Sequence, residues 1–572
     1  MKLWKLSEVF VAGFLLFSSF SCSENPPYRT SVREATSAPP IVYYDYIIIG
    51  GGTSGCPLAA TLSHGATVLV LERGGSPYYN SNVTHISKFA TTLSDTSPSS
   101  PTQQFVSRDG VLNARARVLG GGSALNAGFY TRAGQDYVKK AGWNETLVNQ
   151  SYRWVEKLVA FEPPMLEWQS AVRDGLIEVG VLPYNGFTYD HIYGTKVGGT
   201  IFDREGYRHT AADLLQYADP RSLEVYLHAT VHKILFIYHK ERRPKAFGVI
   251  FKDAHGVKHR AYLKRNSKNE IILSAGAIGS PQLLMLSGIG PAHHLRAHKI
   301  KVVLDQPMVG QGMADNPMNI LFIPSPRPVE VSLIQVVGIT KFDSYIETAS
   351  GLSFAHSLAH RLSESFELLL NQSDQPFTIA PEAFGRATPF REATLKGGII
   401  LEKIMGPRST GHLELQNIDP HDNPSVTFNY FKEPEDLRRC VEGMRTIIEV
   451  VNSKAFSKFR DRKYPVQTLL NMMASLPLNL RPKHARAAVS LEQFCIDTVM
   501  TIWHYHGGCQ VGRVIDQDYK VFGVSALRVI DGSTFHHSPG TNPQATVMML
   551  GRYMGRRILE ERHSKGVKEN RV

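Results

Sequence analysis

The clearest pattern near the start of the chain is two short apolar runs separated by a glycine-rich stretch. Residues 44–50 read Tyr-Asp-Tyr-Ile-Ile-Ile-Gly and residues 67–72 read Thr-Val-Leu-Val-Leu-Glu, and each run predicts a short buried strand. The stretch between them begins as a glycine turn and continues as a helix to Leu62. This order of strand, helix and strand predicts a β-α-β unit and therefore a parallel sheet.

The glycines of the first turn have the spacing of a dinucleotide-binding loop. Gly50 permits the tight turn, Gly52 lets the backbone approach a pyrophosphate, and Gly55 lets the helix lie close to the strand. The N-terminus of that helix offers N–H groups to the anion. Glu72 ends the second strand, where a carboxylate can accept hydrogen bonds from ribose hydroxyls. The pattern predicts a bound dinucleotide but does not separate NAD from FAD.

Further glycine-rich stretches lie far apart along the chain. Residues 116–126 form a second glycine loop, and residues 276–290 follow an apolar run at 270–274 that predicts another strand. Residues 531–533 read Asp-Gly-Ser, and residues 540–546 read Gly-Thr-Asn-Pro-Gln-Ala-Thr.

These stretches together resemble the glucose–methanol–choline (GMC) oxidoreductases, a family of FAD-dependent flavoproteins, from about residue 44 to residue 562. The resemblance implies an α/β fold in which a Rossmann-like FAD-binding domain joins a substrate-binding domain built on an antiparallel sheet flanked by helices. We expect the FAD-binding domain at 44–160, 215–320 and 495–565, and the substrate-binding domain at 161–214 and 321–494.

Within the family the chain is most similar to the plant branch of HOTHEAD-type proteins and almond-type hydroxynitrile lyases. The stretches that carry this likeness are GGGTSGCPLAATLS, RVLGGGSALNAGFYTRA, MADNPMN and TIWHYHGGC. HOTHEAD-type likeness implies oxidation of long-chain ω-hydroxy fatty acids toward cutin precursors.

The resemblance also implies which residues surround FAD. Some members bind FAD covalently through a histidine in the second glycine loop, but residues 116–132 contain none, so we expect non-covalent FAD. The implied FAD-contacting residues are Gly50, Gly52, Thr53, Ser54, Gly55, Glu72, Arg73, Val118, Gly122, Asn126, Ala127, Gly128, Phe129, Val231, Trp503, Asp531, Gly532, Pro543 and Gln544.

Residues 501–509, Thr-Ile-Trp-His-Tyr-His-Gly-Gly-Cys, carry two histidines two positions apart. In an extended segment both would share one face, so spacing alone leaves open which is the base. The family pattern places the base directly after an aromatic residue, which selects His504 after Trp503 and leaves His506 as the alternative. In the implied mechanism, neutral His504 takes the hydroxyl proton while hydride passes to the flavin, and Asn542 hydrogen-bonds the substrate oxygen.

The residues around Asn542 also predict a helix start. Asn before Pro is typical of an N-cap followed by the first helical residue, so we expect Asn542 at the cap and Pro543 in the first turn. Such a helix N-terminus would stabilise the negative charge of a reduced flavin. We interpret His536, His537 and Cys509 as structural residues.

Three functions remain open. The first is FAD-dependent oxidation of an alcohol CH–OH group, by an oxidase or a dehydrogenase. The second is a hydroxynitrile lyase with a structural flavin. Almond-type lyases carry a second histidine where this chain has Asn542 and use a substrate-domain cysteine, whereas residues 150–430 contain no cysteine. The third is a secreted flavoprotein without activity.

The N-terminus predicts secretion. A charged start, an apolar run at 9–20 and small residues to Ser23 are typical of a signal peptide over 1–23, with a disordered leader at 24–43. The plant-branch resemblance implies a Cys440–Cys495 disulfide. Because a signal peptide and a disulfide are both typical of the secretory route, the expected localisation is extracellular or the ER lumen. Sequons for N-glycosylation stand at Asn82, Asn144, Asn149 and Asn371.

Charge and composition restrict the partners. The net charge is +12, yet the Lys and Arg residues are scattered singly, which disfavours nucleic-acid binding. The sequence contains no C-x-x-C pair, and we expect no metal site. No later apolar run is long enough to span a bilayer. We expect a small-molecule alcohol as the partner, and the oligomeric state is left open.

Overall fold

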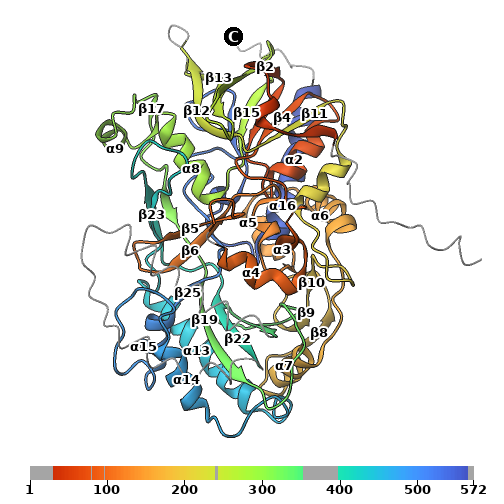
Figure 1. Cartoon of the computed structure of the whole chain (residues 1–572), viewed down its shortest axis with the longest axis vertical. Helices are drawn as coiled ribbons and strands as arrows, with labels where there is room; N and C mark the ends of the chain where they lie inside the picture. The colour runs from red at the N-terminus through yellow and green to blue at the C-terminus, as the bar shows by residue number, and fades with distance from the viewer. Residues whose placement is uncertain are drawn as a thin grey trace, which may run out of the picture.

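The computed structural model describes residues 30–78, 80–95, 97–238, 243–351, 397–540 and 542–564. A parallel sheet lies in the upper half of Figure 1 and an antiparallel sheet in the lower half, so the molecule has two parts along its long axis. This arrangement confirms the expected fold class.

The upper sheet has six strands, all parallel, in the order β1-β11-β4-β3-β15-β26. Both faces of β3, β4 and β15 are buried, which is why each reads as a continuous apolar run. Helix α2 (Gly55–Leu62) connects β3 to β4 and packs against the long C-terminal helix α16 (Gln544–His563). The strands are β1 (Val32–Glu34), β11 (Leu223–Leu227), β4 (Val68–Leu71), β3 (Tyr46–Ile49), β15 (Glu270–Leu273) and β26 (Leu527–Val529).

The leader is ordered where the structure describes it, and the expected disorder is wrong for residues 30–43. Strand β1 pairs with β11 at the edge of the parallel sheet, and β2 (Ile41–Tyr44) pairs with β14 (Lys258–Leu263) in a second sheet. That second sheet has the order β12-β13-β14-β2 and is completed by β12 (Thr230–Ile237) and β13 (Lys245–Lys252). Backbone pairing with two sheets thus orders a segment whose composition is typical of a disordered leader.

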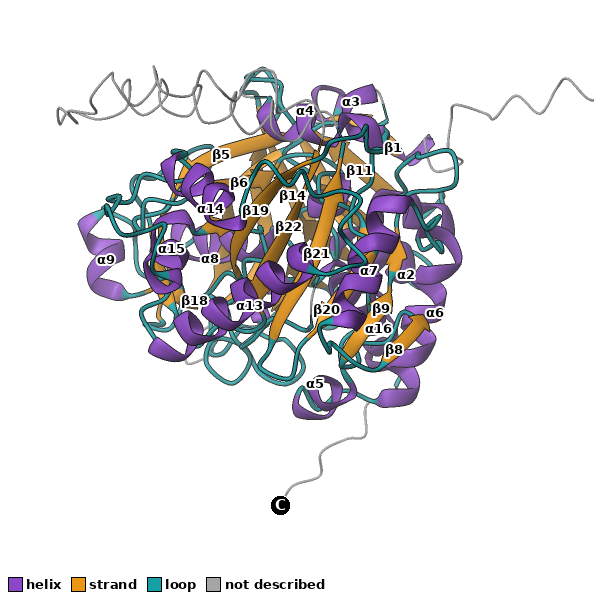
Figure 2. Cartoon of the chain, turned by 90° about the horizontal axis from the view of Figure 1, so that it is seen from below, coloured by secondary structure: helices purple, strands orange, loops and turns teal. Residues whose placement is uncertain are grey.

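The lower sheet has seven strands in the order β25-β19-β22-β21-β20-β9-β8. Its neighbours are antiparallel except β8 and β9. Helices α13 (Pro434–Asn452) and α7 (Glu167–Glu178) cover one face, as Figure 2 shows from below. The strands are β25 (Met500–Thr501), β19 (Pro317–Pro324), β22 (Gly397–Ile404), β21 (Ser344–Ser350), β20 (Val336–Ile339), β9 (Gly194–Val197) and β8 (Tyr184–Phe187).

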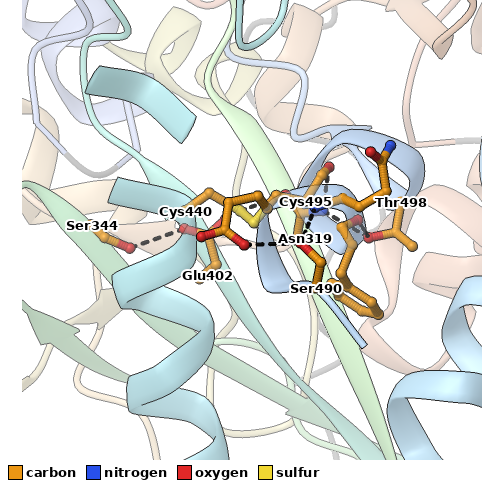
Figure 3. The surroundings of a disulfide bond; sticks show 10 residues. Asn319, Ser344, Glu402, Cys440, Ser490, Cys495 and Thr498 are labelled. Atoms are coloured by element: carbon orange, nitrogen blue, oxygen red, sulfur yellow. Dashed lines mark hydrogen bonds between the residues drawn. A yellow bond between two sulfur atoms is a disulfide. The ribbon is translucent and has the colours of Figure 1, made fainter. Parts of the chain in front are cut away.

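A disulfide joins Cys440 of α13 to Cys495 of α15 (Leu491–Thr498), which confirms the expected pairing (Figure 3). Asn319 of β19 lies beside it, and its Nδ2 donates to the Cys495 carbonyl at 3.0 Å and to Thr498 Oγ1 at 2.8 Å. The disulfide therefore ties α15 to α13, and Asn319 ties α15 to the lower sheet, just before the segment that carries His504.

None of the described helices is long and apolar enough to cross a membrane.

The remaining helices and strands are shorter or lie outside the two large sheets. The further helices are α3 (Ser81–Thr84), α4 (Phe89–Ser94), α5 (Gln135–Lys140), α6 (Glu145–Val159), α8 (Gly276–Leu286), α9 (Ala292–Ala297) and α14 (Val466–Ser475). The further strands are β5 (Thr102–Val106), β6 (Leu112–Ala116), β7 (Phe129–Tyr130), β10 (Gly199–Thr200), β16 (Ile289–Gly290), β17 (Leu304–Asp305), β18 (Gln311–Met313), β23 (Gly411–Glu414) and β24 (Ser425–Thr427).

The sequons differ in accessibility. Asn144 is exposed at the N-cap of α6, Asn149 is exposed on that helix and Asn82 is half-buried, whereas Asn371 lies outside the described residues.

Candidate active site

A cavity of about 440 Å³ lies between the parallel and antiparallel sheets. Its wall contains His504, Asn542 and every residue expected at FAD except Gly55. The residues come from segments as distant as 50–54, 116–129 and 531–544, so only the folded chain brings them together. Gly55 lies behind the wall, where it lets α2 pack against the first turn.

The glycines of the first turn differ in what surrounds them. Gly50 has φ +104°, and a Cβ on it would lie 2.4 Å from the Ser274 carbonyl oxygen. A Cβ on Gly55 would lie 2.0 Å from the Gly50 oxygen. At Gly52 the nearest atom to a Cβ would be 3.7 Å away, so this side of the turn is open to the cavity. Gly50 and Gly55 therefore hold the turn, and Gly52 leaves space for a ligand.

The cavity beside this turn suits an anion. Thr53 and Ser54 line it just before the start of α2, so the helix N-terminus faces it. Arg73 and Arg115 also line it, and their guanidiniums donate to neutral oxygens, Gln103 Oε1 among them. Neither forms an ion pair with a carboxylate among the described residues. The open glycine turn and the helix N-terminus fit the pyrophosphate of a dinucleotide, and the two arginines add positive charge to the same cavity wall.

Glu72 lies at the end of β4, where the ribose was expected. Its Oε2 accepts from the Gly51 N–H at 2.9 Å and its Oε1 from the Gly74 N–H at 2.8 Å. Burial raises the pKa of Glu72, and these backbone N–H groups oppose that shift. The two N–H bonds fix the carboxylate in place, while its remaining lone pairs suit hydroxyl donors.

The loop expected along the flavin is held from two sides. Asn126 Nδ2 donates to Gln544 Oε1 at 2.8 Å, and Gln544 Nε2 donates to the Phe129 carbonyl at 2.7 Å. Arg208, which sequence reasoning missed, donates to the Asn126 carbonyl at 2.6 Å and lies 4.4 Å from the Phe202 ring centroid. The loop and the start of α16 therefore form one hydrogen-bonded unit.

The segment that carries His504 is held by one buried carboxylate. Asp315 accepts from the His504 backbone N–H at 2.8 Å and from the hydroxyls of Thr501 and Tyr430, both at 2.6 Å. Trp503 has φ +60°, a left-handed conformation that costs free energy for a bulky residue. Because three hydrogen bonds to Asp315 surround this position, they compensate for the strain and aim the next side chain into the cavity.

His504 itself is buried, with 9% of its surface exposed, and lines the cavity. Its Nδ1 lies 3.1 Å from Asn316 Nδ2, which also donates to Ser538 Oγ at 3.2 Å. Nε2 forms no hydrogen bond to a described residue. Burial, and then the charges of Lys403 and His506, hold the pKa of His504 well below its usual range, so the imidazole is neutral at physiological pH.

His506 is oriented differently. Its Nδ1 lies 3.0 Å from the His504 carbonyl oxygen, which can only accept, so Nδ1 carries the proton. His506 is 2% exposed and does not line the cavity. His536 and His537 are exposed, Cys509 is fully buried, and none of the three lines the cavity. Of the histidines considered, His504 has the access that a base requires.

The helix start differs from the sequence expectation by one residue. Helix α16 begins at Gln544 with Pro543 at the N-cap, and no side chain caps it. Asn542 instead turns its Oδ1 toward Lys403 Nζ, 2.9 Å away. The expected Asn542 cap is therefore wrong, because a buried ammonium is a stronger donor to the amide oxygen than a backbone N–H.

Lys403 is a second site-adjacent residue that sequence reasoning missed. It lies on β22 with none of its side chain exposed, and its Nζ is 2.8 Å from Glu347 Oε1 of β21. A signal was present: Glu402 and Lys403 follow the apolar run 398–401 without a turn residue between them. In a buried strand those charges require partners.

The end of the cavity at the lower sheet is apolar. Alternate residues of β19 and β22 point into it, and further residues come from β21, from the segment before β20, from the C-terminal end of α14 and from the segment before His504. The lining residues of this part are Met318, Ile320, Phe322, Ile334, Ala349, Ile399, Leu401, Met473, Leu476, Met500 and Ile502.

Comparison with known proteins identifies the family. GMC oxidoreductase models match residues 44–318 and 407–551. The chain is 52% identical to Protein HOTHEAD of Arabidopsis thaliana, over 95% of this chain and 92% of that one. It is 47% identical to a protein named (R)-mandelonitrile lyase-like, also of Arabidopsis thaliana, over 94% of this chain and 93% of the other. The crystal structure of formate oxidase superimposes with a TM-score of 0.71 at 19% identity, over 92% of this chain and 99% of the other. The chain therefore belongs to the GMC oxidoreductases and is an FAD-dependent oxidoreductase.

Proposed function

We propose that the protein oxidises the CH–OH group of a lipophilic primary alcohol, with His504 as the base and Asn542 as the group that holds the substrate oxygen. The observation that carries the proposal is the position of these two side chains. Both line the cavity beside residues expected along the flavin, where polar groups meet an apolar wall. Bound FAD would accept the hydride at its ring.

The protein residues then handle the proton and the oxygen. His504 Nε2 takes the hydroxyl proton, which requires that Nδ1 carry the ring proton. A half-turn of the Asn316 amide would place its oxygen, instead of its nitrogen, against Nδ1 and select that tautomer. Asn542 Oδ1 accepts from Lys403, so its N–H groups remain to donate to the substrate oxygen. General-base catalysis of this kind contributes about 10²–10⁴-fold.

For the substrate we propose a long-chain alcohol such as an ω-hydroxy fatty acid. The support is the apolar end of the cavity, lined by side chains of the lower sheet and of α14. A long alkyl chain would bury surface there, at about 0.8 kcal/mol per CH₂ group. A short polar alcohol would leave this wall unused.

An anaerobic spectral titration of the purified holoprotein tests the proposal. Primary alcohols of graded chain length should bleach the flavin band near about 450 nm, and longer chains should do so at lower concentration. Release of cyanide from mandelonitrile without bleaching would instead support the lyase function. A flavin that no alcohol reduces, in a protein that releases no cyanide, would support a binding protein without activity.

Variants of the two histidines test the assignment of the base. His504→Ala should retain the yellow flavin and lose flavin reduction by about 10²-fold or more. His506→Ala is the matched control, two residues away and outside the cavity, and should lose far less. The opposite ranking would assign the base to His506.

We also propose that the protein is secreted and glycosylated. The buried Cys440–Cys495 disulfide and the exposed sequons at Asn144 and Asn149 support passage through an oxidising compartment. Glycosidase treatment of the protein from its native source should increase its electrophoretic mobility. Unchanged mobility together with an intact N-terminus at Met1 would contradict secretion.

A further inference from the structure

We propose that Lys403 is a positioning residue of the reaction, which turns the Asn542 amide so that its N–H groups face the substrate oxygen. The inference rests on the proposed alcohol oxidation, because it assigns a task to Asn542. Lys403 does not line the cavity, so it acts through Asn542 and not by touching the substrate.

The geometry determines the orientation of the amide. An ammonium donates hydrogen bonds and accepts none, so the Asn542 atom 2.9 Å from Lys403 Nζ is the oxygen. The amide nitrogen then occupies the other branch of the side chain. Asn542 retains 9% of its surface, lines the cavity and forms no second hydrogen bond to a described side chain. Its N–H groups are therefore available to a ligand oxygen.

Glu347 in turn fixes Lys403. The two residues lie on adjacent strands, their charged atoms are 2.8 Å apart, and both side chains are fully buried. Lys403 Nζ also lies 5.8 Å from the Tyr345 ring centroid, which favours a cation. Glu347 balances the charge of Lys403, so the ammonium can remain inside the sheet. Besides Glu347 and the Tyr345 ring, the ammonium contacts Asn542.

Stability alone does not account for this arrangement. A buried ion pair contributes little to stability compared with apolar side chains of the same size, because both charges lose their hydration. Lys196 provides a comparison in the same sheet. It is also fully buried, but its Nζ donates to Thr131 Oγ1 and to the carbonyls of Thr188 and Asp190, none of which lines the cavity. Its one approach to the wall that the structure records is to the Phe129 ring, whose centroid lies 6.0 Å from Nζ.

Single and paired substitutions test the inference in the FAD-loaded protein. Lys403→Met removes the donor and keeps the length of the chain. Because this change leaves Glu347 buried without a partner, the double variant Lys403→Met/Glu347→Leu is made beside it and should fold without an unpaired charge. Lys196→Met is the matched control for loss of a buried lysine. Flavin content and the thermal midpoint are recorded for each variant.

The readout is the rate of anaerobic flavin reduction at saturating alcohol, with the apparent dissociation constant of the alcohol. Lys403→Met and the double variant should reduce the rate by about ten- to hundredfold, with a much smaller change in the dissociation constant. In an Asn542→Ala background, Lys403→Met should change the rate by less than about twofold, because the amide through which it acts is gone. Lys196→Met, compared at equal flavin content, should change the rate far less than Lys403→Met, because Lys196 donates no hydrogen bond to a group that lines the cavity.

Other results would overturn the inference. If Lys403→Met lowered the rate by the same factor in the Asn542→Ala background as in the unsubstituted protein, Lys403 would not act through the amide. An equal loss in Lys196→Met would show a general requirement for buried lysines in the sheet. If alcohols reduce the flavin of the unsubstituted protein, either of these results refutes only the role of Lys403. An unsubstituted flavin that no alcohol reduces refutes the proposed function and this inference together.

Discussion

Removal of the Cys440–Cys495 bond should destabilise the protein by an amount that the loop length sets. The cysteines are separated by 55 residues, and the chain-entropy model converts a loop of that length into about 4 kcal/mol. Both cysteines are fully buried, so Cys440→Ala/Cys495→Ala is the appropriate change, since serine would add an unpaired hydroxyl.

The expected shift in melting temperature follows from the size of the unit that unfolds. The entropy of unfolding is about 2.1 cal/mol/K per residue, or about 1 kcal/mol/K for a chain of roughly 500 residues. A loss of 4 kcal/mol then lowers the midpoint by about 4 °C. If the substrate-binding part unfolds alone, the unit is about half as large and the shift is about twice as great.

Differential scanning calorimetry of the FAD-loaded protein measures this shift. The unsubstituted protein should approach the midpoint of the double variant when a reductant that reaches the bond is added, and the double variant should not respond. Cys56 and Cys509 are buried free thiols in both proteins and cancel in the comparison. An unchanged midpoint, or an equal effect of the reductant on both proteins, would refute the argument from loop length.

Three further substitutions have defined outcomes. Burial raises the pKa of Asp315 to about 6, so the folded protein favours the protonated carboxyl. The stabilisation from this proton is fully present below about pH 4, and the free energy of unfolding falls by about 3 kcal/mol as the pH rises through 6. Asp315→Asn should remove this dependence, and urea titrations between about pH 4 and 7 would contradict the reasoning if both proteins changed alike. Gly55→Ala should abolish FAD retention, measured by the flavin-to-protein absorbance ratio, because its Cβ would lie 2.0 Å from the Gly50 oxygen. Arg528→Met should lower the free energy of unfolding by about 3–5 kcal/mol, because the buried guanidinium donates to Glu270 and Glu561, each at 2.7 Å. The thermal midpoint measures this loss, and a midpoint within about one degree of that of the unsubstituted protein would contradict it.

The elements that local sequence determines were predicted well. The strands β3, β4 and β15 are short apolar runs buried on both faces, and the turn after β3 places Gly50 at φ +104°, a conformation that favours glycine. The residues expected at FAD could be selected for the same reason, since each belongs to a short pattern in one segment. The structure brings these segments to one cavity.

Residues whose role depends on a distant partner were not predicted. Lys403 and Asn542 are 139 positions apart, and nothing near either one indicates the hydrogen bond between them. The same holds for Asp315, which lies in the connection between β18 and β19 and accepts a hydrogen bond from the backbone of His504. The leader was misjudged because its composition is polar, whereas its order comes from pairing with β11 and β14.

The order of strands in the parallel sheet has a consequence for biosynthesis. The sheet receives β26 from residues 527–529, and α16 follows it to form part of the same wall. A nascent polypeptide therefore cannot complete its nucleotide pocket until residues 527–547 have been synthesised, and until then β15 lacks one neighbour. FAD therefore finds its complete binding surface only after the first and last of these segments have come together.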